Sequence, residues 1–185
     1  LLESRGLGDV YKRQISNDKL IFEEKSDAFT VGINLTSDEK YFIITSSDHN
    51  TSEQYYFKST EENPEPKLIK KRNKGIIYSV NSWDNHFYNH TNENAEDFKI
   101  DYCNDLSIQD WKSYIPAQEE TLIGSLFFLN NWILRSEISN ALPKIFVKNI
   151  KTNQEEEIKF TDEKIIDPGI SFYQKDRDTL SLIHI

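Results

Sequence analysis

Short runs of aromatic and β-branched residues recur along the chain, for example at positions 41–45, 87–91 and 132–134, and polar stretches separate them. The chain lacks long segments with apolar residues at the 3.6-residue spacing of an amphipathic helix. Aromatic and branched side chains pack well on the pleated surface of a sheet, so such runs are typical of strands. The pattern therefore predicts an all-β fold.

The predicted strands follow a repeat. Phe42, Phe87 and Trp132 are each 45 residues apart, and each follows a short turn-forming stretch that contains Asp or Asn. Each unit has a strand, a tight turn, a second strand, a polar loop, and third and fourth strands. The expected strands are 30–35, 41–45, 53–58 and 66–70; then 76–82, 87–91, 97–102 and 111–115; then 122–128, 132–134, 144–150 and 156–160, with polar loops at 46–52, 91–95 and 136–141.

Four strands in a period of about 40 to 50 residues are typical of the blades of a β-propeller. The sequence therefore predicts a partial propeller of about three four-stranded blades. Residues 15–29 are expected to end a preceding blade, and residues 165–179 to open a following one. An antiparallel sandwich with evenly spaced strands is the alternative that the pattern leaves open.

The two ends of the chain carry a different signal. Residues 180–185 (LSLIHI) can be encoded by CTGTCTCTTATACACATC, and the reverse complement of that DNA encodes DVYKRQ, the sequence of residues 9–14. This antisense relation resembles a transposase adapter used in library preparation. We therefore expect residues 1–14 and 180–185 to be adapter-derived and non-native, residues 15–179 to be the native domain, and the natural reading frame to continue on both sides.

The net charge bears on the class of binding partner, and the cysteine content bears on the cellular compartment. The chain has 22 Lys and Arg against 31 Asp and Glu, for a formal net charge of −9, which argues against nucleic acid as a partner. The one basic run, residues 67–74, is expected to be a solvated strand edge protected by lysine. No apolar stretch is long enough to cross a bilayer, and a single cysteine, Cys103, suits the reducing cytoplasm.

Two clusters invite a catalytic or metal-binding interpretation. Ser46, Ser47, Asp48 and His49 are adjacent in sequence, but a triad needs its members to meet in space, and the chain has no Gly-x-Ser-x-Gly elbow. We expect a loop there. His86 and His90 lack a Cys or acidic partner at ligand spacing, so we expect turn and strand-face residues. The sequence predicts no catalytic residue, metal ligand or cofactor in this chain.

Aromatic and acidic residues each admit a structural and a functional interpretation. Trp83, Trp111 and Trp132 are expected to pack between blades, and a surface that stacks peptides is the alternative. Glu119 with Glu120, and residues 155–157, are expected to form solvated faces, although such charge could also attract basic peptides.

Four segments carry a family resemblance. SSDHNTSEQYYF (46–57), YSVNSWDNHFYNHTNENAEDFKI (78–100), WKSYIP (111–116) and LIGSLFFLNNWILRSEISNALPKIFVKNIKT (122–152) resemble the oligopeptidase B group of the prolyl oligopeptidase family. The resemblance covers roughly residues 19–173, in order and without large gaps, and its specificity lies in the whole ordered set.

The resemblance implies a seven-bladed N-terminal propeller joined to a C-terminal α/β-hydrolase domain, in serine peptidases that cleave short peptides after Arg or Lys. It implies that the propeller covers the active site and excludes folded proteins, and that the catalytic triad lies in the other domain. No position of this chain matches the family's catalytic motifs, so the fragment alone is expected to be inactive. The rival interpretation is a non-catalytic β-propeller that binds a protein partner through its faces.

Overall fold

The computed structural model describes residues 18–159, 168–171 and 181–184, and these contain strands and no helix. Three four-stranded antiparallel sheets follow one another along the chain. The first has β1 (Thr30–Leu35), β2 (Tyr41–Ser47), β3 (Ser52–Lys58) and β4 (Lys67–Lys70); the second β5 (Tyr78–Trp83), β6 (His86–Thr91), β7 (Lys99–Cys103) and β8 (Lys112–Ile115); the third β9 (Thr121–Phe128), β10 (Trp132–Ser139), β11 (Leu142–Asn149) and β12 (Glu155–Glu157). The last two strands, β13 (Pro168–Ser171) and β14 (Ser181–His184), pair with each other.

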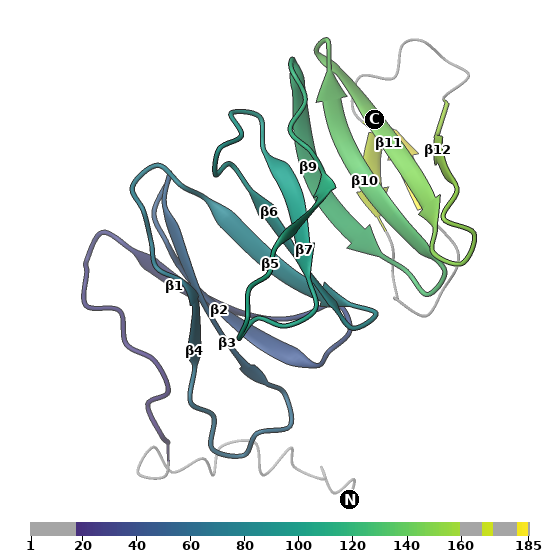
Figure 1. Cartoon of the computed structure of the whole chain (residues 1–185). Coiled ribbons are helices and arrows are strands. Elements are labelled where there is room, and N and C mark those ends of the chain that lie inside the picture. The colour runs from purple at the N-terminus through teal and green to yellow at the C-terminus, as the bar shows by residue number, and fades with distance from the viewer. Residues whose placement is uncertain (1–17, 160–167, 172–180, 185) are drawn as a thin grey trace, which may run out of the picture.

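Figure 1 shows the three sheets side by side in chain order, with β1–β4 on the left, β5–β8 in the middle and β9–β12 on the right. Within each sheet the strands lie in chain order, so the first strand of each unit is at one edge and the fourth at the other. This arrangement confirms the predicted all-β partial propeller. Three separate sheets in series exclude the two-layered sandwich.

The strand boundaries agree with the prediction to within two residues except in the third unit. The predicted polar loop at 136–141 is wrong, because β10 continues to Ser139. The last pair between β10 and β11 is Ser139 with Leu142. Asn140 and Ala141 alone make the turn, with φ values of 53° and 60°. Two consecutive residues with positive φ are the geometry of a two-residue type I′ hairpin, which needs no longer loop.

The segments next to the three sheets differ from each other. The sequence predicts that residues 15–29 end a preceding blade. Their described part, 18–29, forms no strand, but Phe22 packs on Tyr55 with ring centroids 4.7 Å apart. β13 lies within the segment expected to open a following blade. In the described part of the chain, no helix could cross a membrane.

Buried residues form a cluster at each contact between sheets. The cluster between the first and second sheets contains Ile43, Ile69, Tyr78, Val80, Phe87, Cys103 and Leu106. The cluster between the second and third contains Trp83, Tyr88, Ile100, Ile123, Phe128 and Ile133. We call these contacts the first interface and the second interface. A third cluster, Leu129, Leu134 and Ile145, lies in the third sheet and also takes in Trp132.

Candidate functional site

The serine, aspartate and histidine cluster of the first sheet does not assemble a triad. Ser46 and Ser47 end β2, so the predicted loop is shorter than expected, and the buried Ser46 hydroxyl donates to Glu24. Asp48 accepts the backbone N–H groups of Asn50 and Thr51 at 2.9 and 2.7 Å, which lowers its pKa. His49 is exposed. The Asp48 carboxylate therefore holds a turn and does not orient the imidazole.

A charged cluster that the sequence did not reveal lies on the first sheet. Arg72 donates to Glu24 at 2.6 Å and to Glu53 at 3.1 Å, and its guanidinium lies 4.1 Å from the centre of the Phe29 ring. Hydrogen bonds from Ser46 and from Arg72 lower the pKa of Glu24 to about 2. Arg72 belongs to the basic run, so the expectation of a merely solvated edge holds only in part.

Two other residues of that run, Ile69 and Lys70, contact the second sheet. β4 is the edge strand of its sheet, as expected, but the Ile69 side chain is buried in the first interface. Lys70 forms an ion pair with Glu93 from the loop that follows β6. Part of the basic run therefore connects the first sheet to the second, while Lys67, Lys71 and Lys74 are exposed.

Side chains of β3 cap the free edge of β5 at the first interface. Ser52 Oγ accepts the N–H of Tyr78 at 2.7 Å, and Gln54 Oε1 accepts the N–H of Val80 at 2.8 Å. The Tyr78 hydroxyl in turn accepts the N–H of Gln54 at 2.7 Å and donates to the carbonyl of Lys70. Burial raises the pKa of Tyr78 to about 12, so the hydroxyl keeps its proton. The edge thus has hydrogen-bond partners without a neighbouring strand.

The turns at one end of the first interface add further hydrogen bonds. Ser37 N donates to Asn81 Oδ1 at 2.9 Å, and Ser82 Oγ donates to Asp38 Oδ2 at 2.8 Å. Lys40 Nζ donates to Asn85 Oδ1 at 2.9 Å. These bonds fix the β1–β2 turn against β5 and the turn that follows it.

The second interface depends on rings. Trp83 stacks on Phe128 with centroids 5.9 Å apart, and Tyr88 lies 5.1 Å from the same ring. The Lys148 ammonium lies 4.7 Å from the centre of the Tyr114 ring. Trp83 and Trp111 therefore pack between blades, as predicted, whereas Trp132 packs against the third cluster, within the third sheet.

A second buried arginine was also missed. Arg135 on β10 is 6% exposed, donates to Glu137 at 2.7 Å and to Glu155 at 2.8 Å, and lies 4.5 Å from the centre of the Phe146 ring. Glu155 is therefore paired and not merely part of a solvated face. Arg135 and Glu137 are visible in the sequence as charged residues inside an apolar run, but Glu155 could not be identified as their partner because it lies on β12.

The two histidines predicted to be turn and strand-face residues lie on β6. His86 Nδ1 lies 2.7 Å from the carbonyl of Asp84 in the preceding turn. His90 Nε2 lies 2.8 Å from the carbonyl of Ile123, and its ring stacks on Phe98. Burial lowers the pKa of His90. Across the described ranges, no group of three His, Cys, Asp or Glu residues could hold a metal ion.

The lone cysteine is buried in the first interface, with 2% of Cys103 exposed. Burial raises the pKa of its thiol to about 11. A thiol that keeps its proton at neutral pH is a poor nucleophile. Cys103 therefore acts as a core residue.

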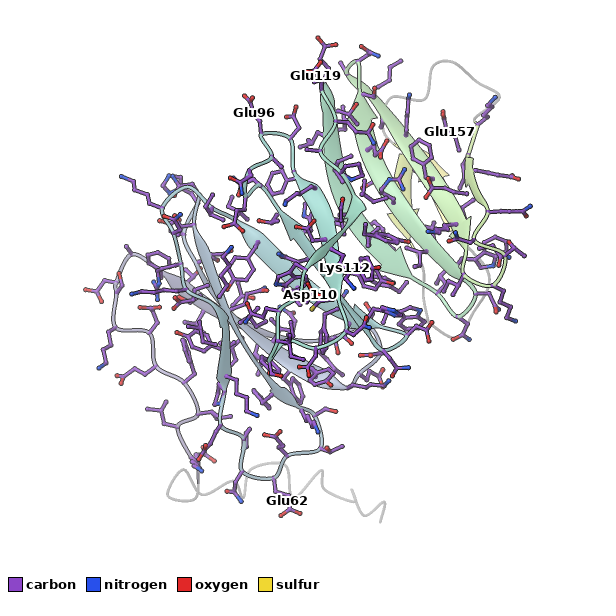
Figure 2. All side chains as sticks on the ribbon, viewed as in Figure 1. Glu62, Glu96, Asp110, Lys112, Glu119 and Glu157 are labelled. Atoms are coloured by element: carbon purple, nitrogen blue, oxygen red, sulfur yellow. The ribbon has the colours of Figure 1, made fainter. Side chains whose placement is uncertain are left out.

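Acidic residues gather at the end of the molecule opposite the β5–β6 turn. Figure 2 shows Glu96 and Glu119 pointing outward from the loops before β7 and β9, while Glu62 points out at the far end. Glu120 lies next to Glu119 in the turn that opens β9, with φ of 54°. Glu119 and Glu120 are exposed, as predicted.

Comparison with known proteins gives a consistent picture. The family described as "Prolyl oligopeptidase, N-terminal beta-propeller domain" matches residues 10–182. Protease 2 of Moraxella lacunata is 30% identical over 135 residues, which cover 72% of this chain and 19% of that protein. Dipeptidyl aminopeptidase BI of Pseudoxanthomonas mexicana is 24% identical over 174 residues, covering 92% of this chain and 24% of that protein.

Solved structures show the same fold. Oligopeptidase B from Trypanosoma brucei, in a closed form with covalently bound antipain, superposes with a TM-score of 0.79 at 17% identity, covering 95% of this chain and 27% of that one. Oligopeptidase B from Leishmania major superposes with a TM-score of 0.71 at 18% identity, covering 80% of this chain and 22% of that one. The chain thus spans about a fifth to a quarter of the length of these relatives.

Proposed function

Because this chain belongs to the prolyl oligopeptidase family through its N-terminal β-propeller domain, we propose that the whole protein is a serine-type oligopeptidase that cleaves short peptides after arginine or lysine. The match of the family over residues 10–182 is the observation that carries this proposal. The relatives named as a protease and an aminopeptidase support peptide hydrolysis as the reaction class. The proposed compartment is the cytoplasm.

The proposed role of these blades is steric selection. The partner would be a C-terminal α/β-hydrolase domain of the same protein, which would supply the nucleophile, the base and the acid of the triad. The blades would cover that site, admit short peptides and exclude folded proteins, as gating elements do when they control access. The sequence supports this division, because none of its six glycines forms a nucleophile elbow.

The experiment compares this chain with the protein made from the complete reading frame. The complete protein is expected to hydrolyse an Arg-terminated chromogenic peptide, to lose that activity with a serine-directed phosphonate, and to leave a folded protein substrate intact. The 185-residue chain is expected to hydrolyse neither substrate.

Two outcomes would overturn the proposal. Peptidase activity in the purified 185-residue chain would place the catalytic groups within these blades. A complete reading frame that closes the propeller and then stops, without a Gly-x-Ser-x-Gly followed by Asp and His, would favour the non-catalytic binding module.

A further inference from the structure

A cavity of about 350 Å³ lies where the turns of all three sheets meet. Its volume is within the range of about 300 to 1,000 Å³ that small-molecule pockets occupy. The lining residues are Asp38 from the β1–β2 turn, Trp83 and Asp84 from the end of β5 and its turn, Asn130 from the β9–β10 turn, and Ile150 and Lys151 after β11. The cavity therefore depends on the relative placement of three blades.

The apolar part of the cavity is held rigidly. Trp83 is 9% exposed and stacks on Phe128 with an interplanar angle of 22°, which fixes the indole. The backbone N–H of Ile150 donates to the carbonyl of Asn131 at 3.0 Å, which fixes the opposite wall to the β9–β10 turn. An indole is the aromatic group that attracts a cation most strongly.

Two carboxylates lie on the side of the first and second sheets. Asp38 has a side chain that is 9% exposed and accepts the hydroxyls of Thr36 and Ser82 at 2.8 Å each, so its orientation is set. Asp84 is exposed and occupies the tight turn with φ of 48°. The Lys40 ammonium forms an ion pair with Asp38 at 3.9 Å and also donates to Asn85 at 2.9 Å, so the carboxylate that remains for a ligand is that of Asp84.

A positive charge comes from the third sheet. Lys151 is exposed and lines the cavity with Ile150, while both carboxylates come from the other two sheets. The lining thus combines carboxylates from the first two sheets, an ammonium from the third and the Trp83 indole. A ligand that matches it carries a cation and a carboxylate at opposite ends of a short apolar stem.

We infer that this cavity binds ligands with a basic side chain beside a free carboxylate, as in a peptide that ends in arginine. The guanidinium lies over Trp83 and pairs with Asp84, while the carboxylate pairs with Lys151. This inference stands on the cavity alone and requires no catalysis by the chain, so it survives or fails separately from the proposed peptidase activity.

The test uses the 185-residue chain and the indole N–H resonance of Trp83, identified in a ¹⁵N spectrum by comparison with Trp83→Phe. Nα-acetyl-L-arginine is titrated as the probe and is expected to shift that resonance with saturation. Nα-acetyl-L-citrulline, which has no cation, and Nα-acetyl-L-argininamide, which has no carboxylate, are each expected to bind about tenfold more weakly.

Three variants make the test specific. Asp84→Asn keeps a residue that tolerates positive φ and is expected to weaken acetylarginine binding about tenfold. Lys151→Gln is expected to weaken acetylarginine binding but not acetylargininamide binding. Asp110→Asn removes the same charge at an exposed position outside the cavity, which Figure 2 labels beside Lys112, and is expected to change nothing.

The inference is overturned by any of three results. These are no saturable shift of the Trp83 indole, equal binding of acetylcitrulline, or an equal effect of Asp110→Asn and Asp84→Asn. If Asp84→Asn loses its dispersed spectrum, the Lys151→Gln comparison between the two arginine probes decides the question in the same way.

Discussion

The first and second interfaces join neighbouring blades of the same family fold by different means. At the first, side chains of Ser52, Gln54 and Tyr78 bond the backbone of the opposite sheet at 2.7 to 2.9 Å. At the second, the rings of Trp83 and Tyr88 pack against the ring of Phe128. Hydrogen bonds are directional and cost most when one partner is lost, whereas ring packing contributes through buried area. Directional hydrogen bonds therefore contribute more to the first interface, and ring packing contributes more to the second.

The largest expected effect is in the second interface. Phe128→Ala removes a side chain that is 2% exposed and leaves a cavity between Trp83 and Tyr88. We expect the free energy of unfolding, measured by urea titration, to fall by about 3 to 5 kcal/mol.

The control for that variant lies on the same strand. Leu122 of β9 is 40% exposed, so Leu122→Ala is expected to cost well under about 2 kcal/mol. Equal losses for the two variants would mean that the ring contacts contribute no more than a surface side chain.

Two tyrosine variants compare the interfaces directly. Tyr78→Phe removes the hydroxyl that bridges Gln54 and Lys70, which leaves a buried N–H and a carbonyl without that partner. We expect a loss of about 1 to 3 kcal/mol in the free energy of unfolding. Tyr88→Phe, at a similarly buried ring that contributes by packing, is expected to cost less than about 0.5 kcal/mol. The reverse order would contradict the contrast between the interfaces.

A smaller effect is expected at the capped edge of β5. Gln54→Met keeps the volume of the buried side chain but removes the acceptor of the Val80 N–H, so we expect a loss of about 1 kcal/mol and faster exchange of the Val80 amide. Gln118→Met, at an exposed position before β9, is the matched control. An unchanged Val80 exchange rate would show that Gln54 does not cap this edge.

The smallest expected effect is a pH dependence of the second interface. Burial lowers the pKa of His90, so the unfolded chain binds the proton more readily than the folded chain. The stabilisation is complete above the ordinary histidine pKa of about 6.5 and is lost as the pH falls below it. His90→Gln is expected to flatten the urea stability profile between about pH 5 and pH 7, whereas His49→Gln, at an exposed site, should leave the slope intact.

The strands could be predicted from the sequence because each blade repeats one order of strands and turns. The end of β10 was wrongly predicted to be a loop for a physical reason. The charged residues Arg135 and Glu137 interrupt the apolar pattern that predicts a strand, although both side chains are buried. Their burial is explained by Glu155, which lies 20 positions from Arg135 in the sequence. A pattern along one strand carries no information about such a partner on another.

The interface chemistry could not be predicted for the same reason. In the sequence, Tyr78 is one of many aromatic residues in predicted strands. Only its position against β3 and β4 shows that its hydroxyl bonds the backbone of Gln54 and Lys70. Arg72 and Glu24 are 48 positions apart, and Glu24 lies in a segment without strand pairing. The predicted absence of a catalytic residue and the predicted native range of 15–179 stay predictions.

Backbone hydrogen exchange at β5 tests the central claim most directly, because Tyr78 and Val80 have their amide acceptors on the neighbouring blade. If the blades stack as described, these two amides exchange as slowly as amides within the β5–β6 ladder. If they exchange at the rate of unprotected amides while the ladder stays protected, the first two sheets are not joined, and the account is wrong.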